Sequence, residues 1–401
     1  MRKEGSWRHA LPRLIGLALM LVMAAAILAA CGSSSSSSSG SGGGGGTAAD
    51  AKVLSEAEAV LKKGYAGEFQ PPPKSGPAAA KGKTVWFISC GQAFEACSYQ
   101  SELFQEAGKA LGWNVVVQDG KAEPTLAANI IRQAIAAHVD GVIAAFYDCP
   151  SIKSALVDAK DANMPVVGLD SVDCNSPVFG GDEPPLFAAG TKLRGSTDPT
   201  SWYKEWATAR ADYTIAKTKG EGKVIQIWEN TQAIQQVNGN AYAAQLEKCG
   251  GCELKRVAFN FSQVPNPATQ TWKSAMLSNP TFNTVDTGMD ALMFLGLQTA
   301  VEGAGRPIEV EGAEMNPGNV ALIHEGQQAS AAGLPYGWFA WAAADTLNRL
   351  FAGENPAKFP NEGSGWQFID AEHNLPPEGQ PWEPPVNYRA AYEKIWDGTG
   401  G

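Results

Sequence analysis

The sequence predicts an α/β protein of two lobes, each built on a parallel β-sheet. Short apolar segments of strand length recur along the chain, and amphipathic segments of helical length separate them. These short segments are uniformly apolar rather than alternating, which suits strands that helices cover on both faces. The pattern occurs as two successive sets, so we expect two lobes.

The first set starts where the chain becomes apolar at Thr84. Strands are predicted over residues 84–89, 113–118, 139–146 and 165–169. A helix is predicted over residues 99–111, and two more begin near Pro124 and Pro150, because proline suits the first turn of a helix. Strands that alternate with helices at this spacing form right-handed βαβ units in a parallel sheet.

The second set repeats this alternation. Strands are predicted over residues 223–228 and 254–259, and helices around residues 202–217 and 233–248. This second α/β unit predicts the second lobe.

The first 30 residues are predicted to be a lipoprotein signal peptide. Residues 1–13 are basic, residues 14–30 are almost wholly apolar, and no stop-transfer pattern follows. Leu28-Ala29-Ala30-Cys31 resembles the bacterial lipobox, whose cysteine receives a diacylglycerol and becomes the new N-terminus. We therefore expect a lipid-anchored protein of the cell envelope, outside the cytoplasmic membrane. The alternative is an ordinary thiol at Cys31 after a plain signal.

Residues 31–82 are predicted to connect the lipid anchor to the folded body. A Ser/Gly tether spans residues 33–46, a short amphipathic helix residues 52–63, and a proline-rich linker residues 67–83. The tether offers no side chains to pack, so the body should reorient freely at the membrane surface.

Composition argues against several function classes. The net charge of −10 disfavours nucleic acid, because a duplex-binding protein presents a basic face. Outside the signal the histidines are His138, His324 and His373, which are far apart and lack metal-ligand spacing with cysteine. Sequence motifs of hydrolases, metalloproteases and phosphate-binding loops are missing, so we expect neither an enzyme nor a metal or cofactor.

Polar and aromatic side chains follow the predicted strands, where ligands bind in open parallel sheets. They are Gln92, Phe94 and Glu95 after the first strand, Tyr147 and Asp148 after the third, Asp170 and Ser171 after the fourth, and Glu229, Asn230 and Gln232 after the first strand of the second set. Facing loops of this kind would form a cleft for a small polar ligand. Asp and Asn in such positions are also common as turn and cap residues.

The stretch from Lys83 to about Gly353 resembles the periplasmic-binding-protein type I family, the sugar-binding receptors of ABC transporters related to ribose-binding protein. The order of the motifs carries the resemblance more than any one of them. They include "KTVWFIS", "AGKALGWNVVVQDG", "IIRQAIAAHVDGVIA", "SALVDAKDANMPVVGLDS", "LSNPTFNTVDTGMDALMFLGLQTAVEGAG" and "ALIHEGQ".

The resemblance implies two Rossmann-like lobes joined by a hinge. The first would span residues 83–178 plus about 332–353, and the second residues 179–331 plus about 354–401, including an extended tail. The family's function implies a monomer that binds a small polar ligand, with a sugar as the expected class, and delivers it to an ABC permease. A sensor that reports ligand to a membrane signalling receptor is the alternative.

By position, the resemblance assigns the ligand contacts to Phe94, Asp170, Asp290 and Glu314. Four departures remove polar groups that such receptors use: Ser171 stands in place of an arginine, Met289 stands in place of an asparagine, "QQVNGN" lacks a second arginine, and "AAGLPYG" lacks a hinge glutamine. The identity of the ligand therefore stays open.

Six cysteines besides Cys31 suit an oxidising compartment. We expect the disulfides Cys90–Cys97, Cys149–Cys174 and Cys249–Cys252. The second pair follows from the resemblance, in which the third and fourth strands are neighbours. Since the first and third strands are neighbours too, a Cys90–Cys149 bond is the alternative.

Lipidation gives the first testable prediction. A Cys31→Ser variant should remain unprocessed and unacylated, because the thiol is the acceptor of the lipid. Mass spectrometry of the membrane fraction measures this, with Ser33→Ala as the control that should be acylated normally. A wild-type mature chain that starts at a residue other than Cys31 would contradict the prediction.

Overall fold

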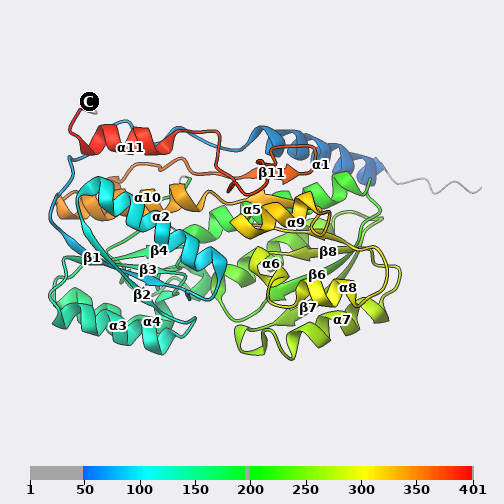
Figure 1. The fold of residues 1–401 in the computed structure, drawn as a ribbon, viewed down its shortest axis with the longest axis horizontal. Coiled ribbons are helices and arrows are strands. Elements are labelled where there is room, and N and C mark those ends of the chain that lie inside the picture. Colours follow the sequence, from blue (N-terminus) through cyan, green and yellow to red (C-terminus); the bar gives the residue numbers. More distant parts are fainter. Residues whose placement is uncertain (1–47, 195–197, 400–401) are drawn as a thin grey trace, which may run out of the picture. The chain divides into compact units, whose positions relative to one another are not determined.

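The computed structural model describes residues 48–194 and 198–399, and it confirms the α/β class with two lobes built on separate sheets (Figure 1). The signal peptide, Cys31 and the Ser/Gly tether lie outside the described residues. Within those residues, no helix combines the length and the apolar composition that crossing a bilayer requires.

The first sheet is entirely parallel, with the strand order β2-β1-β3-β4-β5. Its strands are β1 (Thr84–Ser89), β2 (Asn114–Asp119), β3 (Gly141–Ala145), β4 (Val166–Leu169) and β5 (Ala189–Gly190). The helices that alternate with them are α2 (Glu95–Leu111), α3 (Pro124–Ala136) and α4 (Cys149–Asp161). Figure 1 shows α3 and α4 on one face of this sheet and α2 on the other. Strands β3 and β4 are buried at every position, as their unbroken apolar sequences predict.

The second sheet has the order β11-β10-β9-β8-β6-β7 and is parallel except for β11, which runs antiparallel to β10. Its strands are β6 (Lys223–Glu229), β7 (Glu253–Phe259), β8 (Thr284–Thr287), β9 (Glu309–Glu311), β10 (Ser330–Gly333) and β11 (Gln367–Asp370). Its helices are α5 (Pro199–Lys217), α6 (Ala233–Leu246), α7 (Ala268–Ser278), α8 (Leu297–Glu302) and α9 (Pro317–His324).

Short 3-10 turns complete the chain between these elements. They are η1 (Pro177–Phe179), η2 (Phe261–Gln263), η3 (Asp290–Met293) and η4 (Pro356–Lys358). The chain passes between the lobes more than once, because α10 (Tyr336–Phe351) follows a strand of the second sheet but packs on α2 and β4 of the first. The residue boundaries of the two lobes stay a prediction.

Helix α2 begins earlier than predicted, at Glu95 rather than at residue 99. The loop after β1 is correspondingly short, and Phe94 occupies the N-cap position with extended backbone. The Cys90–Cys97 disulfide therefore joins this loop to the first turn of the helix. Phe94 and Glu95 consequently stand at the carboxyl edge of the sheet.

The N-terminal helix and the C-terminal tail form one additional layer. Helix α1 (Ala48–Ala66) packs on α5 and β11, and α11 (Tyr388–Trp396) packs on α10. Figure 1 shows α1 and α11 on the same side of both sheets. In α11, Trp396 stacks on Trp341 at 5.1 Å between ring centroids and donates a hydrogen bond from Nε1 to Asp345 Oδ1 at 2.8 Å. The tail thus adds a strand to the second lobe and a helix to the first.

The tail should contribute strongly to stability. Trp396 is 2% exposed, so a Trp396→Ala variant should lower the free energy of unfolding by about 3 to 5 kcal/mol through the cavity that it leaves. Denaturant unfolding measures this, and Leu277→Ala, at a side chain that is 54% exposed, is the control and should change little. A loss below about 1 kcal/mol for Trp396→Ala would show that the tail is only loosely attached.

Candidate functional site

A cavity lies where loops of the two lobes meet, at the carboxyl ends of both sheets. The first lobe lines it from the loops that follow β1, β2 and β3, with Cys90, Phe94, Cys97, Ala122, Phe146 and Tyr147. The second lobe and the start of α10 line it from segments that follow β6, β7, β8, β9 and β10, with Gln232, Gln235, Phe261, Met289, Glu314 and Tyr336. Eight different strand ends thus converge on one cavity.

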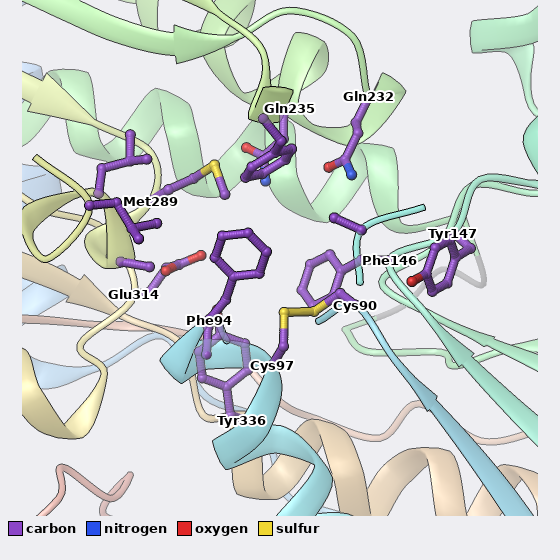
Figure 2. A pocket seen from close by; sticks show the side chains of 16 residues that line it. Cys90, Phe94, Cys97, Phe146, Tyr147, Gln232, Gln235, Met289, Glu314 and Tyr336 are labelled. Carbon is purple, nitrogen blue, oxygen red and sulfur yellow. A yellow bond between two sulfur atoms is a disulfide. The ribbon is translucent and has the colours of Figure 1, made fainter. Parts of the chain in front are cut away.

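The walls of the cavity are mainly apolar. Figure 2 shows the ring of Phe94 pointing into the cavity, with the Glu314 carboxylate on one side and Phe146 on the other. Phe94 meets Phe261 of the second lobe at 5.6 Å between ring centroids. The Cys90–Cys97 disulfide forms part of the wall beneath these rings.

Two carboxylates of the first lobe accept hydrogen bonds from the second. Asp148 Oδ2 accepts from the backbone N–H of Ala233 at 2.9 Å, and Glu95 Oε1 accepts from that of Gly318 at 3.0 Å. Both donors lie in the first turn of a helix, where free N–H groups and the helix dipole favour a negative charge. Burial raises the pKa of Asp148 to about 6 and also raises that of Glu95. These contacts hold the lobes closed over the cavity.

Four of the predicted ligand contacts line the cavity together: Phe94, Tyr147, Gln232 and Glu314. The Tyr147 hydroxyl donates to Ser89 O at 3.2 Å, so it can serve a ligand only as an acceptor.

Two further predicted contacts, Gln92 and Glu95, line an adjoining hollow at the mouth of the cavity. Gln92 Nε2 donates to Ser89 Oγ at 2.7 Å, within its own lobe. Glu95 is engaged with Gly318, as described above.

The structure places Asp290 and Asp170 behind the cavity rather than among its lining residues. Asp290 accepts hydrogen bonds from Ala313 N at 2.7 Å and Met315 N at 2.6 Å, so it fixes the loop that carries Glu314. Asp170 is buried, accepts a hydrogen bond from Gln100 Nε2 at 3.1 Å and also hydrogen-bonds with the Tyr203 hydroxyl. Their role as ligand contacts stays a prediction.

Burial governs the electrostatics behind the cavity. It raises the pKa of Asp170 to about 7, and burial together with the charge of Asp290 raises the pKa of Glu314 to about 7. Glu314 Oε2 accepts hydrogen bonds from Asp290 N at 3.1 Å and Asn316 Nδ2 at 3.2 Å. The buried Tyr336 hydroxyl lies beside this carboxylate and hydrogen-bonds with it, which offsets part of the effect of burial on the pKa of Glu314. Glu314 and Tyr336 thus form one polar group on the cavity lining.

Sequence reasoning missed several of the larger lining side chains, among them Phe146, Gln235, Phe261, Met289 and Tyr336. Most have the same signal as the predicted ones, a position just after a strand. Phe261 follows β7, and Tyr336 lies three residues after β10. Gln235 lies one helical turn after Gln232, so it faces the same side of α6. Treating the residues that follow every strand as candidate ligand contacts would have included them.

The structure contains the disulfides Cys90–Cys97, Cys149–Cys174 and Cys249–Cys252. Among the described residues, one group of three side chains has the spacing of metal ligands: Cys149, Asp173 and Cys174. Both of its sulfurs belong to one disulfide, which leaves no thiolate to bind a metal.

The raised pKa of Glu314 predicts how stability depends on pH. A carboxyl with a higher pKa in the folded chain binds its proton more tightly there, so its contribution to stability is lost as the pH rises from the ordinary value of 4.5 to about 7. We therefore expect the melting temperature of the ligand-free protein to fall between about pH 4.5 and pH 7. The contribution of Glu314 amounts to about 3 kcal/mol over its whole titration.

A Glu314→Gln variant should show a smaller fall, because its amide does not titrate. Asp170 titrates in the same range, so some fall should remain. Glu393→Gln, at an exposed position of α11, is the control and should keep the wild-type slope. Equal slopes for Glu314→Gln and the wild type would contradict the prediction.

Comparison with known proteins agrees with this geometry. Residues 97–355 match a family model described as periplasmic binding protein domain. No curated protein sequence matches the chain.

Solved structures share the fold at low sequence identity. A periplasmic solute binding protein of an ABC transporter from Actinobacillus succinogenes, with bound D-allose, has a TM-score of 0.61 at 16% identity, covering 72% of this chain and 98% of that one. A carbohydrate transporter from Acidothermus cellulolyticus, in complex with myo-inositol, has a TM-score of 0.56 at 17% identity, covering 79% and 99%. A glucose-galactose binding protein from Geobacillus stearothermophilus has a TM-score of 0.59 at 16% identity, covering 72% and 98%.

The family match extends over more than half of the chain, and the two lobes with their shared cavity have the architecture that the resemblance implied. This chain therefore belongs to the periplasmic binding protein family, with the type I fold.

Proposed function

We propose that this protein is a lipid-anchored receptor outside the cytoplasmic membrane, which closes its lobes on a small solute and delivers it to an ABC permease. The observation that carries the proposal is the cavity between the lobes, closed by Asp148 and Glu95 at the helix N-termini of the opposite lobe. A sugar is the ligand class that the resemblance implies, and the structural neighbours named above are described with D-allose, myo-inositol or glucose and galactose.

Closure follows from differential affinity. The cavity has walls from both lobes, so only the closed form presents Phe94 and Phe261 to the same ligand. A ligand that contacts both walls shifts the population toward that form by the difference in its affinity for the two forms. In this proposal Phe94, Tyr147, Gln232 and Glu314 contact the ligand, while Asp170 and Asp290 support them from behind.

Binding without catalysis is supported by the chemistry of the lining. The cavity is lined by no histidine or lysine, and its two cysteines are joined in a disulfide. A nucleophilic or general-base mechanism lacks the usual paired groups there. The disulfides also suit the oxidising environment of the cell envelope.

The Glu95 contact offers a test of closure. A Glu95→Ala variant removes one hydrogen bond that only the closed form makes, so ligand affinity should fall about 5-fold, corresponding to about 1 kcal/mol. The ligand is the one that a thermal-shift panel of sugars, polyols, nucleosides and small acids identifies. Calorimetry measures affinity, and uptake of that ligand is measured in a strain that lacks the gene.

The matched control is Glu102→Ala, at an exposed acid on the same helix α2, which should bind like wild type. Wild-type protein should restore uptake, and Glu95→Ala should restore it only at higher ligand concentration. Uptake that is unaffected by loss of the gene would refute the transport role and favour the sensor.

A further inference from the structure

We propose that the cavity selects an uncharged ligand with an aromatic or similarly flat apolar body and a hydrogen-bond-donating group directed at Glu314. An aromatic alcohol or aromatic glycoside is then a strong ligand, and a free hexose is a weak one. This inference rests on the proposed function, because it takes the cavity between the lobes as the solute site.

Aromatic side chains approach the cavity from both lobes. Phe94 and Phe146 belong to the first lobe and Phe261 to the second, and Phe94 and Phe261 are tilted by 59° with centroids 5.6 Å apart. Aromatic rings in such tilted arrangements attract a further ring placed between or beside them. Closing the lobes would bring these phenylalanines around a flat apolar body.

Aliphatic side chains extend the same wall. Met289, Leu292 and Leu295, from the segment after β8, line the cavity beside Phe261. None of these side chains can accept or donate a conventional hydrogen bond. A free hexose carries hydroxyl groups around its whole ring, so several would be buried here without partners, which is unfavourable.

Few polar side chains line the cavity, and they lie in two groups on opposite sides of Phe94. The side chain of Gln232 and the Nε2 of Gln235 make no hydrogen bond with a described residue, while Gln235 Oε1 accepts from Asn238 Nδ2 at 3.2 Å. Figure 2 shows both glutamines on the opposite side of Phe94 from Tyr336. At the other end, Glu314 and the Tyr336 hydroxyl beside it lie on the cavity lining. A ligand donor at this end would hydrogen-bond with the Glu314 carboxylate.

The charged groups of the cavity lining disfavour an anionic ligand. Of the 16 side chains that line the cavity, Glu314 is the one acid, and no arginine, lysine or histidine joins it. The buried Arg210 nearby is committed to Asn238 and Asp286 within the second lobe. A carboxylate ligand would therefore meet Glu314 without a compensating cation.

Four probes separate the contributions of the ring, the hydroxyls and the charge: D-glucose, phenyl β-D-glucopyranoside, 2-phenylethanol and phenylacetate. Calorimetry on the full mature protein should show phenyl glucoside binding at least about 10-fold more tightly than glucose, since it adds only the ring. Likewise, 2-phenylethanol should bind at least about 10-fold more tightly than phenylacetate, which carries the same ring with a negative charge.

Variants test where the ring binds. Phe94→Ala and Phe261→Ala should each weaken phenyl glucoside at least about 10-fold and reduce its preference over glucose, because each variant removes a ring that contacts the aromatic group. Phe294→Ala is the matched control, because Phe294 is 50% exposed at the mouth and does not line the cavity. Thermal melting without ligand should confirm that all three variants fold.

The outcomes are separable from those of the proposed function. Glucose binding as tightly as phenyl glucoside, or no binding of either uncharged aromatic probe at millimolar concentration, overturns the aromatic preference. If uptake still depends on the gene, the receptor function stands. The opposite result is also informative. If the protein binds 2-phenylethanol but deletion of its gene leaves all uptake unchanged, the ligand class is supported and the transport role is overturned.

Discussion

The carboxylate of Asp148 accepts hydrogen bonds from two backbone N–H groups, that of Val172 in the first lobe at 3.0 Å and that of Ala233 in the second at 2.9 Å. The ligand cavity depends on this contact, because its walls come from both lobes and face each other only when the lobes are closed. Transfer of a carboxylate from water to such a buried position is unfavourable, which is why the pKa of Asp148 is raised to about 6. Burial of the carboxylate therefore opposes this contact, while the two hydrogen bonds favour it.

The side of the molecule away from the cavity supplies the rigidity that this balance requires. Helix α10 is buried over most of its length, and its Trp338 and Trp341 stack on Tyr388 and Trp396 of the tail. Since α11 packs on the first lobe and β11 extends the second sheet, the tail connects the lobes away from the cleft. The cavity can then retain unfavourable features, such as the buried carboxyl of Glu314, because stability comes from elsewhere.

The sequence predicted the strands and the cleft better than the roles of individual acids. Uniformly apolar segments identified β1, β3 and β4, but β5 is only two residues long and leaves no periodic signal. Asp290 and Glu314 both follow strands of the second sheet, so local sequence treats them alike. Which one lines the cavity depends on the backbone N–H groups of Ala313 and Met315, which bind Asp290. That choice is made by tertiary structure and could not be predicted from local sequence.

Two of the departures from the family pattern, Met289 and Ser171, can be interpreted from the structure. Met289 lies on the cavity wall, so it replaces a polar amide with an apolar surface where a ligand is expected. Ser171 does not reach the cavity, because its hydroxyl accepts from Tyr147 N at 3.0 Å and donates to Ala144 O at 3.1 Å. Neither position offers a polar side chain to the cavity, whose lining includes Phe146 and Phe261. Since strand ends fix where the lining residues stand and not what they are, the aromatic preference that we propose would require new lining side chains and no change of fold.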